Sequence, residues 1–254
     1  MSTDTVATQQ LNEGFPAVAV CAPCYNEAEG LTDVVRDWLT VLYDMEEPFE
    51  LLMVDDGSTD GSKDLLAQIA DREPRLLYLR FEDNQGYGIS MNSAVEYSRA
   101  HWVLTIDSDG QFNMEDLPPM LEMARSGQYD VISGVRRKKD PRMSALGGDK
   151  LLRFMGRVLH GMKTTDPQCA FKLWRGDALR HITKHVEPEG FLTPSLWVLA
   201  AQKLGLRIGN MSVHHLDRSA GESKLDPASD GPAMVASMTK LKKKLKNLEP
   251  FARE

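Results

Sequence analysis

Short, nearly continuous hydrophobic runs alternate along the chain with longer stretches of helical periodicity. The hydrophobic runs occupy residues 17–22, 50–54, 76–80, 102–106 and 129–133. Their length and their lack of polar alternation are typical of strands buried on both faces. Helical stretches lie between them, at 27–43, 61–72, 88–100 and 115–126. This alternation predicts successive right-handed βαβ units, and therefore an α/β fold with a mostly parallel sheet flanked by helices.

The alternation of hydrophobic runs and helical stretches changes after residue 135. The pattern there predicts a helix at 147–162, a short strand near 169–174, helices at 176–185 and 193–204, and a strand at 207–213. Together with the first half of the chain, these elements predict one domain over residues 16–228. The largely polar residues 1–15 are predicted to be a flexible leader.

Residues 229–254 are predicted to contain a basic amphipathic helix. Five apolar residues follow a 4-3-4-3 spacing and five lysines lie among them: Met234, Met238, Leu241, Leu245 and Leu248, with Lys240, Lys242, Lys243, Lys244 and Lys246. Such a helix can pack on its own domain, pair with a partner helix or lie on an anionic membrane surface. The spacing leaves all three interpretations open.

Composition narrows the class of protein. The chain has 254 residues, of which 42% are hydrophobic, and its three cysteines are too few for a disulfide framework. No apolar run approaches the roughly 18 residues needed to cross a bilayer, and the N-terminus lacks the features of a secretory signal. The sequence therefore predicts a cytoplasmic protein. The net charge of −7 argues against nucleic acid as a partner.

Two carboxylates directly follow the hydrophobic run 102–106, in the sequence Asp107-Ser108-Asp109, and the amide of Gln111 comes next. Oxygen ligands of this kind suit Mg²⁺ or Mn²⁺ and do not suit zinc. A hard divalent ion usually completes its shell with water and with the phosphates of a substrate. A nucleoside diphosphate is therefore the expected companion, although solvated carboxylates on a turn are the simpler alternative.

Two further loops follow predicted strands. In the loop from Val54 to Gly61, Asp60 or Ser58 can cap the next helix, which leaves Asp56 free to accept a hydrogen bond from a nucleobase. In the loop from Pro23 to Glu27, an aromatic ring and a carboxylate follow the first strand. These two loops together predict a nucleoside site.

The three loops, read as P-x-Y-N-E, D-D-G-S-x-D-G and D-x-D-x-Q, resemble those of the family 2 inverting glycosyltransferases, which have the GT-A (Rossmann-like) fold. Three downstream motifs resemble one branch of that family, the dolichyl-phosphate mannose synthases and related polyprenyl-phosphate glycosyltransferases: Ser133–Arg136, Asp166–Arg175 and Asp217–Leu225. The resemblance extends over residues 17–225.

The resemblance implies a role for each matching residue. The nucleotide sugar would be bound by Pro23, Tyr25, Glu27, Val54, Asp56, Asp107, Ser108, Asp109, Arg136, Arg218 and Lys224. Within that set, Asp109, Arg136, Arg218 and Lys224 would be catalytic, and Asp107, Asp109 and Gln111 would hold Mg²⁺ or Mn²⁺. Metal and fixed cations suit this chemistry, because a leaving diphosphate gains negative charge in the transition state.

The implied reaction is the inverting transfer of a hexose from GDP-mannose or a UDP-sugar to a polyprenyl or dolichyl phosphate. The chain departs from the family at Cys169-Ala170-Phe171, where S-G-F is usual, and at Thr193–Trp197, where many members have an acidic residue. A hydroxyl acceptor needs a general base whereas a phosphate is already ionised, so the second departure favours the phosphate acceptor. A saccharide or other hydroxyl acceptor is the alternative.

A lipid-linked acceptor implies a membrane surface as partner, reached through the basic C-terminal helix or through a membrane-anchoring subunit, at the cytoplasmic face. Two other classes remain. Cys21 and Cys24 form a C-x-x-C between a strand and a helix, which is where a thiol-disulfide oxidoreductase carries its motif. A protein that binds sugar nucleotides without turnover is the other alternative. His214 and His215 are interpreted as strand residues in preference to metal ligands.

Overall fold

The computed structural model describes residues 15–137, 161, 164–216, 245, 248, 250 and 251. In chain order the elements are β1 (Val18–Cys24), α1 (Ala28–Asp44), β2 (Phe49–Asp56), α2 (Ser62–Ala70), β3 (Leu76–Phe81), α3 (Tyr87–Tyr97), β4 (Trp102–Thr105), the 3₁₀ turn η1 (Met114–Asp116), α4 (Leu117–Arg125), β5 (Val131–Arg136), β6 (Lys172–Arg175), α7 (Gly176–His185), the 3₁₀ turn η2 (Gly190–Leu192), α8 (Thr193–Lys203) and β7 (Ile208–Val213). The strands and helices predicted within these ranges are confirmed; the helix predicted at 147–162 lies almost entirely outside them.

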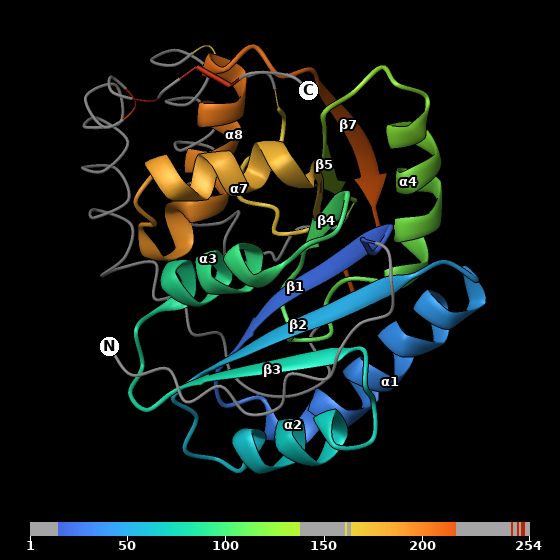
Figure 1. Cartoon of the computed structure of the whole chain (residues 1–254), viewed down its shortest axis with the longest axis vertical. Coiled ribbons are helices and arrows are strands. Elements are labelled where there is room, and N and C mark those ends of the chain that lie inside the picture. The colour runs from blue at the N-terminus through green and yellow to red at the C-terminus, as the bar shows by residue number, and fades with distance from the viewer. Residues whose placement is uncertain are drawn as a thin grey trace.

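The strands form one seven-stranded sheet in the order β3-β2-β1-β4-β6-β5-β7 (Figure 1). All pairings are parallel except those of β6, which runs antiparallel to β4 and to β5. The predicted mostly parallel sheet flanked by helices is therefore confirmed. The antiparallel direction of β6 was not predicted, because a short apolar run carries no information about which neighbour it pairs with.

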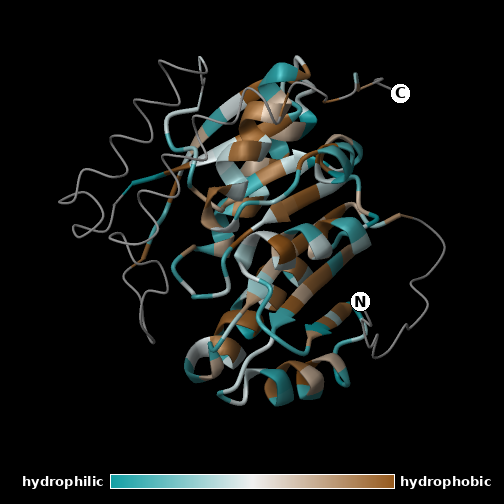
Figure 2. Cartoon of the chain, turned by 90° about the vertical axis from the view of Figure 1, so that its left-hand side faces the viewer, coloured by the Kyte–Doolittle hydropathy of each residue, from teal (hydrophilic) through white to brown (hydrophobic). Residues whose placement is uncertain are grey.

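Helices cover both faces of the sheet, which explains the continuous hydrophobic runs. Along β2, Leu51 and Met53 face the layer of α1, α2 and α4, whereas Leu52 and Val54 face the layer of α3, α7 and α8. Each of these four side chains is fully buried. Figure 2 shows that hydrophobic residues lie on the strands and that hydrophilic residues lie on the connecting loops. A strand packed on both sides has no face on which polar residues can alternate.

The order of the strands defines where a ligand can bind. From β1 the chain moves outward through β2 to β3, and it then returns to the other side of β1 to form β4. Because β1 and β4 are parallel neighbours, the loops that follow them lie next to each other at the carboxyl edge of the sheet. In open α/β sheets this reversal of direction creates the crevice that binds ligands.

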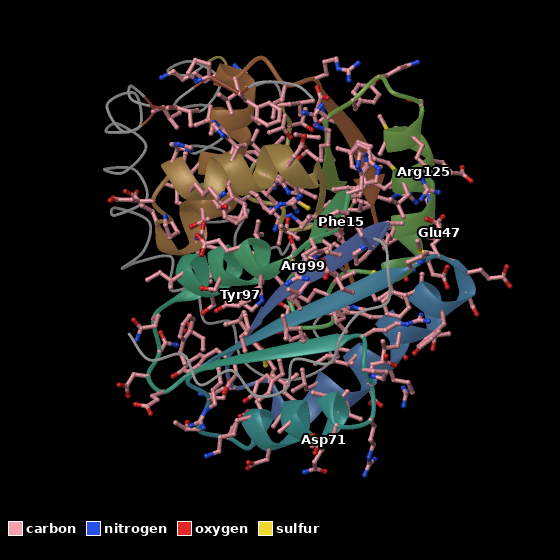
Figure 3. The ribbon with its side chains drawn as sticks, viewed as in Figure 1. Phe15, Glu47, Asp71, Tyr97, Arg99 and Arg125 are labelled. Atoms are coloured by element: carbon pink, nitrogen blue, oxygen red, sulfur yellow. The ribbon has the colours of Figure 1, made fainter. Side chains whose placement is uncertain are left out.

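An ion pair on the surface joins α4 to the connection between α1 and β2. Arg125 ends α4, and its Nη1 donates to Glu47 Oε1 at 2.7 Å (Figure 3). The hydrogen bond from Arg125 holds the pKa of Glu47 below its usual range. Because both side chains are partly exposed, this pair contributes about 1 kcal/mol at most.

The described residues of the C-terminal segment pack on the domain. Leu245 is 6% exposed, and Leu248 and Phe251 contact the same hydrophobic cluster as α7 and α8. The guanidinium of Arg175 lies 5.0 Å from the centre of the Phe251 ring. Leu245 and Leu248 belong to the predicted apolar stripe, so that part of the stripe is used within the molecule. Within the described part of the chain, no helix is long and apolar enough to span a bilayer.

Candidate active site

The three predicted loops meet at the carboxyl edge of β1, β2 and β4. Because these strands are parallel, the residues after Cys24, Asp56 and Thr105 emerge side by side. The loop after β4 is tied to β1 by Ser108, whose Oγ donates to Pro23 O at 2.7 Å. Ser108 and Pro23 are both buried, so this hydrogen bond is shielded from water.

Hydrogen bonds lock the loops after β1 and β2 to one another. Asn26, which has a positive φ of 52°, donates from its backbone N to Ser58 Oγ at 2.9 Å. In return its side-chain Oδ1 accepts from Thr59 N at 2.8 Å. Glu27 N donates to Ser62 Oγ at 2.9 Å. The half-buried side chains of Tyr25 and Glu27 thus stand on a loop whose backbone is fixed.

Asp60 caps two helices at once. Its Oδ2 accepts from the N–H of Ala28, the first residue of α1, and its Oδ1 accepts from the N–H of Ser62, the first residue of α2, both at 3.0 Å. Burial alone would raise the pKa of Asp60, but the hydrogen bonds from Ser62 and Ala28 outweigh it and the pKa is lowered. The predicted capping role is therefore confirmed, and it extends to the helix that follows the first loop.

Asp56 is not free, contrary to the expectation from the sequence. Its two oxygens accept from the backbone N–H groups of Gln85 at 2.7 Å and Gly86 at 2.9 Å, at the start of α3. Burial raises the pKa of this carboxyl group, against the effect of those bonds. A base N–H must therefore share an oxygen that already accepts a backbone hydrogen bond. Val54, one residue before the pair of aspartates, is fully buried in the core beneath α3.

The carboxylates of the D-x-D motif lie close enough to influence each other. Burial and the nearby charge of Asp109 raise the pKa of Asp107 to about 7. A hydrogen bond from Tyr87 supports the Asp107 carboxylate, yet its buried Oδ1 has no hydrogen-bond partner among the residues that the structure describes. Asp109 Oδ1 accepts from Gln111 N at 3.1 Å. Two carboxylates that repel each other and a buried oxygen without a donor are the features that a divalent cation would satisfy.

The residues present therefore fit Mg²⁺ or Mn²⁺. Within 15–137 and 164–216, however, no three His, Cys, Asp or Glu side chains are grouped closely enough to hold a metal between them. Gln111 turns its Nε2 toward Leu216 O, at 3.3 Å. An ion held by Asp107 and Asp109 would thus take its remaining ligands from Gln111 Oε1, water and the phosphates of a substrate.

Two cations beside the acidic pair hold the loop that precedes β6. Arg136 donates from Nε and Nη2 to the two oxygens of Asp166, both at 2.9 Å, and Asp166 is fully buried. Lys172 is also fully buried, and its Nζ donates to the carbonyls of Pro167, at 3.0 Å, and Cys169. Burial lowers the pKa of Lys172 to about 8. Asp166 and Lys172 belong to the motif Asp166–Arg175. Their role could not be predicted from the motif, because it depends on a fold that brings residues 136 and 166 together.

The remaining candidates have clear structural roles or lie outside the described residues. Cys21 and Cys24 are buried thiols, and burial raises the pKa of Cys21, which is the opposite of an activated thiol. His214 bonds to Asp116, and His215 packs edge-on against Phe112. Arg218 and Lys224, predicted to grip phosphate, fall outside the described residues. Tyr87 has no signal in the sequence that marks it as part of the site.

A mostly parallel sheet with an acidic pair at its switch point defines the class of protein. Residues 19–182, which are more than half of the chain, match the family model described as Glycosyl transferase family 2. The chain belongs to this family of glycosyltransferases.

The relatives of this chain are consistent with this family, and the solved structures are consistent with its fold. The undecaprenyl-phosphate 4-deoxy-4-formamido-L-arabinose transferase of Yersinia pestis is 26% identical over 218 residues, which are 84% of this chain and 64% of that protein. The chain thus spans less than two thirds of the length of that relative. Mannosyl-3-phosphoglycerate synthase from Rubrobacter xylanophilus is 18% identical, with a TM-score of 0.67 over 94% of this chain and 77% of that one. Glucosyl-3-phosphoglycerate synthase from Mycobacterium tuberculosis, solved with Mn²⁺ and UDP-glucose, is 19% identical, with a TM-score of 0.65 over 91% and 79%. These structures confirm the GT-A fold.

Proposed function

We propose that the protein transfers a hexose, with inversion, from GDP-mannose or a UDP-sugar to a polyprenyl or dolichyl phosphate, with Mg²⁺ or Mn²⁺ as cofactor. One observation carries the proposal: two neighbouring carboxylates, Asp107 and Asp109, lie where the order of the strands reverses, and the buried Oδ1 of Asp107 has no partner among the described residues. The undecaprenyl-phosphate sugar transferase from Yersinia pestis, to which this chain is similar, supports the acceptor. The structure solved with Mn²⁺ and UDP-glucose supports the donor class and the metal.

The donor would lie across the loops after β1, β2 and β4. Tyr25 and Glu27 offer a ring and a carboxylate to the nucleoside, and Asp56 offers an oxygen that it shares with backbone amides. Pro23 and Val54 are buried, so we assign their contribution to the backbone. Asp107, Asp109 and Gln111 would hold the divalent ion, whose positive charge would stabilise the diphosphate of the donor.

The acceptor would attack directly. A phosphate oxygen forms the new bond to the anomeric carbon while the bond from that carbon to the diphosphate breaks, on the opposite face. No proton has to be removed from an ionised phosphate, and α8, which covers this side of the sheet, contains no acidic residue. This absence favours the phosphate acceptor over the saccharide or other hydroxyl acceptor.

The cations divide into two groups in this proposal. Arg136 is held by Asp166, and its charge lowers the pKa of Asp107, against burial and Asp109, so it acts on the site as a fixed positive charge. Contact with the diphosphate or the acceptor phosphate then falls to Arg218 and Lys224, for which a guanidinium fork and an ammonium are suited. Asp109 acts through the metal.

A lipid-borne acceptor requires access to a membrane surface. We propose that a catalytic domain, residues 16–228, works at the cytoplasmic face of a membrane, with a flexible leader at 1–15 and the basic segment 229–254 facing anionic lipid. Because Leu245 and Leu248 contact the domain, the attraction would come from the lysines of that segment, each contributing about 1 kcal/mol. A membrane-anchoring subunit is the alternative means of recruitment.

Transfer to lipid provides the test. Radiolabelled GDP-mannose, UDP-glucose and UDP-N-acetylglucosamine are incubated separately with a short polyprenyl phosphate and Mn²⁺, and the mixture is extracted with organic solvent. We expect label in the organic phase for one donor, about 100-fold less with Asp109→Asn, and no change with Asp71→Asn, an exposed aspartate at the end of α2. Label that stays in water with every donor would exclude the lipid acceptor. Transfer that survives a chelator would exclude the metal.

A further inference from the structure

Three polar side chains form a connected group beside the acidic pair: Asp116, Arg137 and His214. The backbone N–H of His214 donates to Asp116 Oδ2 at 2.6 Å, and its ring Nδ1 lies 2.9 Å from Asp116 Oδ1. On the other side of the ring, Nε2 lies 2.9 Å from Arg137 Nη1. Asp116 ends η1, Arg137 follows β5 and His214 follows β7. One imidazole therefore joins three elements that are distant in the sequence.

The partners determine which ring nitrogen carries the proton. A guanidinium has only donors, so Arg137 must donate and His214 Nε2 must accept. The proton of the neutral ring then lies on Nδ1, where it donates to the Asp116 carboxylate. Arg137 is fixed in turn, because its backbone N–H donates to Val213 O and its Nε donates to Ser212 Oγ, both at 3.1 Å. The His214 side chain is 46% exposed, yet both of its nitrogens are bonded to protein.

The residues after His214 lie along the metal loop. Leu216 N donates to Gln111 O at 2.7 Å, and Gln111 Nε2 donates back to Leu216 O at 3.3 Å. Between these pairs, His215 forms a β-bridge with Phe112, and their rings are 5.0 Å apart. Residues 214–216 are thus held against residues 111–116, and the motif Asp217–Leu225 follows Leu216 directly in the sequence.

We propose that His214 is a positioning residue for sugar transfer: its bonds to Asp116 and Arg137 hold residues 214–216 against residues 111–116, and so fix Gln111 in the loop that would hold the metal. This inference rests on the proposed function, which gives Gln111 its role. A displacement of about 1 Å in a catalytic group can reduce a rate 100-fold. The loss of His214 should therefore lower kcat.

Four variants separate the two bonds of the ring. His214→Asn places an amide near the position of Nδ1 and can keep the bond to Asp116. His214→Gln reaches the position of Nε2 and can keep the bond to Arg137. His214→Ala removes both bonds. Asp116→Asn keeps the shape of the carboxylate, but it replaces one acceptor oxygen with an N–H donor, so one of the two hydrogen bonds from His214 is lost. His101→Asn is the matched control, because His101 is an exposed histidine before β4, at the opposite edge of the sheet.

Hydrogen exchange of the Leu216 amide reports position without any reaction. We expect this amide to exchange about tenfold faster in His214→Ala and Asp116→Asn, and at the wild-type rate in His101→Asn. In the transfer assay, kcat should fall 10-fold to 100-fold in the first two variants. The variant His214→Asn should retain more activity than His214→Ala. Circular dichroism and urea unfolding identify any variant that does not fold.

The outcomes separate this inference from the proposed function. If the wild type transfers no label to lipid, the proposed function is wrong, and hydrogen exchange still tests whether His214 holds Leu216. If the Leu216 amide exchanges at the wild-type rate in both His214→Ala and Asp116→Asn, the positioning role is overturned. Faster exchange with an unchanged kcat would also overturn it, because the position of Leu216 would not matter for transfer. If His214→Ala does not fold, the comparison of His214→Asn with Asp116→Asn still decides.

Discussion

Replacing Asp60 with alanine should destabilise the protein by about 2 kcal/mol. The side chain caps the first residues of both α1 and α2, with two hydrogen bonds of 3.0 Å. The loss of one capping side chain costs about 0.5–2 kcal/mol, and two helix ends are affected here. Asp60 is an exposed residue, so we take a value of about 1 kcal/mol for each end and add nothing for its charge.

Urea unfolding at neutral pH measures this cost, with Asp71→Ala as the matched control. Asp71 follows the same helix α2 at its other end, and its side chain points to solvent in Figure 3. A negative charge is unfavourable at a helix C-terminus, so the control should be neutral or slightly stabilising. Asp60→Ala should also raise the KM for the donor, because Asp60 ties the start of α1 to the second loop. Equal stabilities of the two variants would refute the double cap.

The effect has a defined pH dependence. Hydrogen bonds from Ser62 and Ala28 outweigh burial and lower the pKa of Asp60 in the folded state. The ionised carboxylate therefore contributes stability above its unfolded pKa, and this contribution is lost as the pH falls through the lower, folded value. The stability difference between wild type and Asp60→Asn should be widest near neutrality and should close below about pH 4. A difference that grew at acid pH would contradict this assignment.

Two further predictions follow from buried groups. Asp166→Ala should destabilise the protein by about 3 kcal/mol in urea unfolding because it removes the carboxylate that accepts two hydrogen bonds from the Arg136 guanidinium, and the double change Arg136→Met with Asp166→Leu should cost less. An equal or larger cost for the double change would contradict the pairing. Cys21 and Cys24 should react slowly with a thiol reagent at pH 7 in the native protein and rapidly in urea, since both are buried and burial raises the pKa of Cys21. Rapid labelling of the native protein would revive the oxidoreductase interpretation.

The strands could be predicted because burial on both faces leaves a simple trace in the sequence. The run 102–106 became β4, and the run 50–54 became the centre of β2. The positions of the site loops followed from the same logic, since the carboxyl ends of parallel strands meet at one edge. The direction of β6 could not be predicted. It contains the fully buried Lys172, whose ammonium donates to carbonyls of the loop that precedes the strand.

The detailed roles of the site residues could not be predicted, because they depend on contacts between distant segments. Asp56 seemed free in the sequence, but the start of α3 folds over it and occupies both of its oxygens. Arg136 carries a charge suited to phosphate, but Asp166, thirty residues further on, accepts hydrogen bonds from its Nε and Nη2. Tyr87 supports Asp107 from α3, and no spacing in the sequence connects these two residues.

The acidic loops therefore contain carboxylates of two kinds. Asp56 and Asp60 each accept two backbone N–H groups, so their oxygens help to fix the loops. Asp107 differs from them, because its Oδ1 has no donor among the described residues, and burial and the charge of Asp109 oppose its ionisation. A buried carboxylate in that state is costly in the absence of a cation. On this contrast we propose that an ion and the diphosphate of a donor would bind at Asp107 and Asp109.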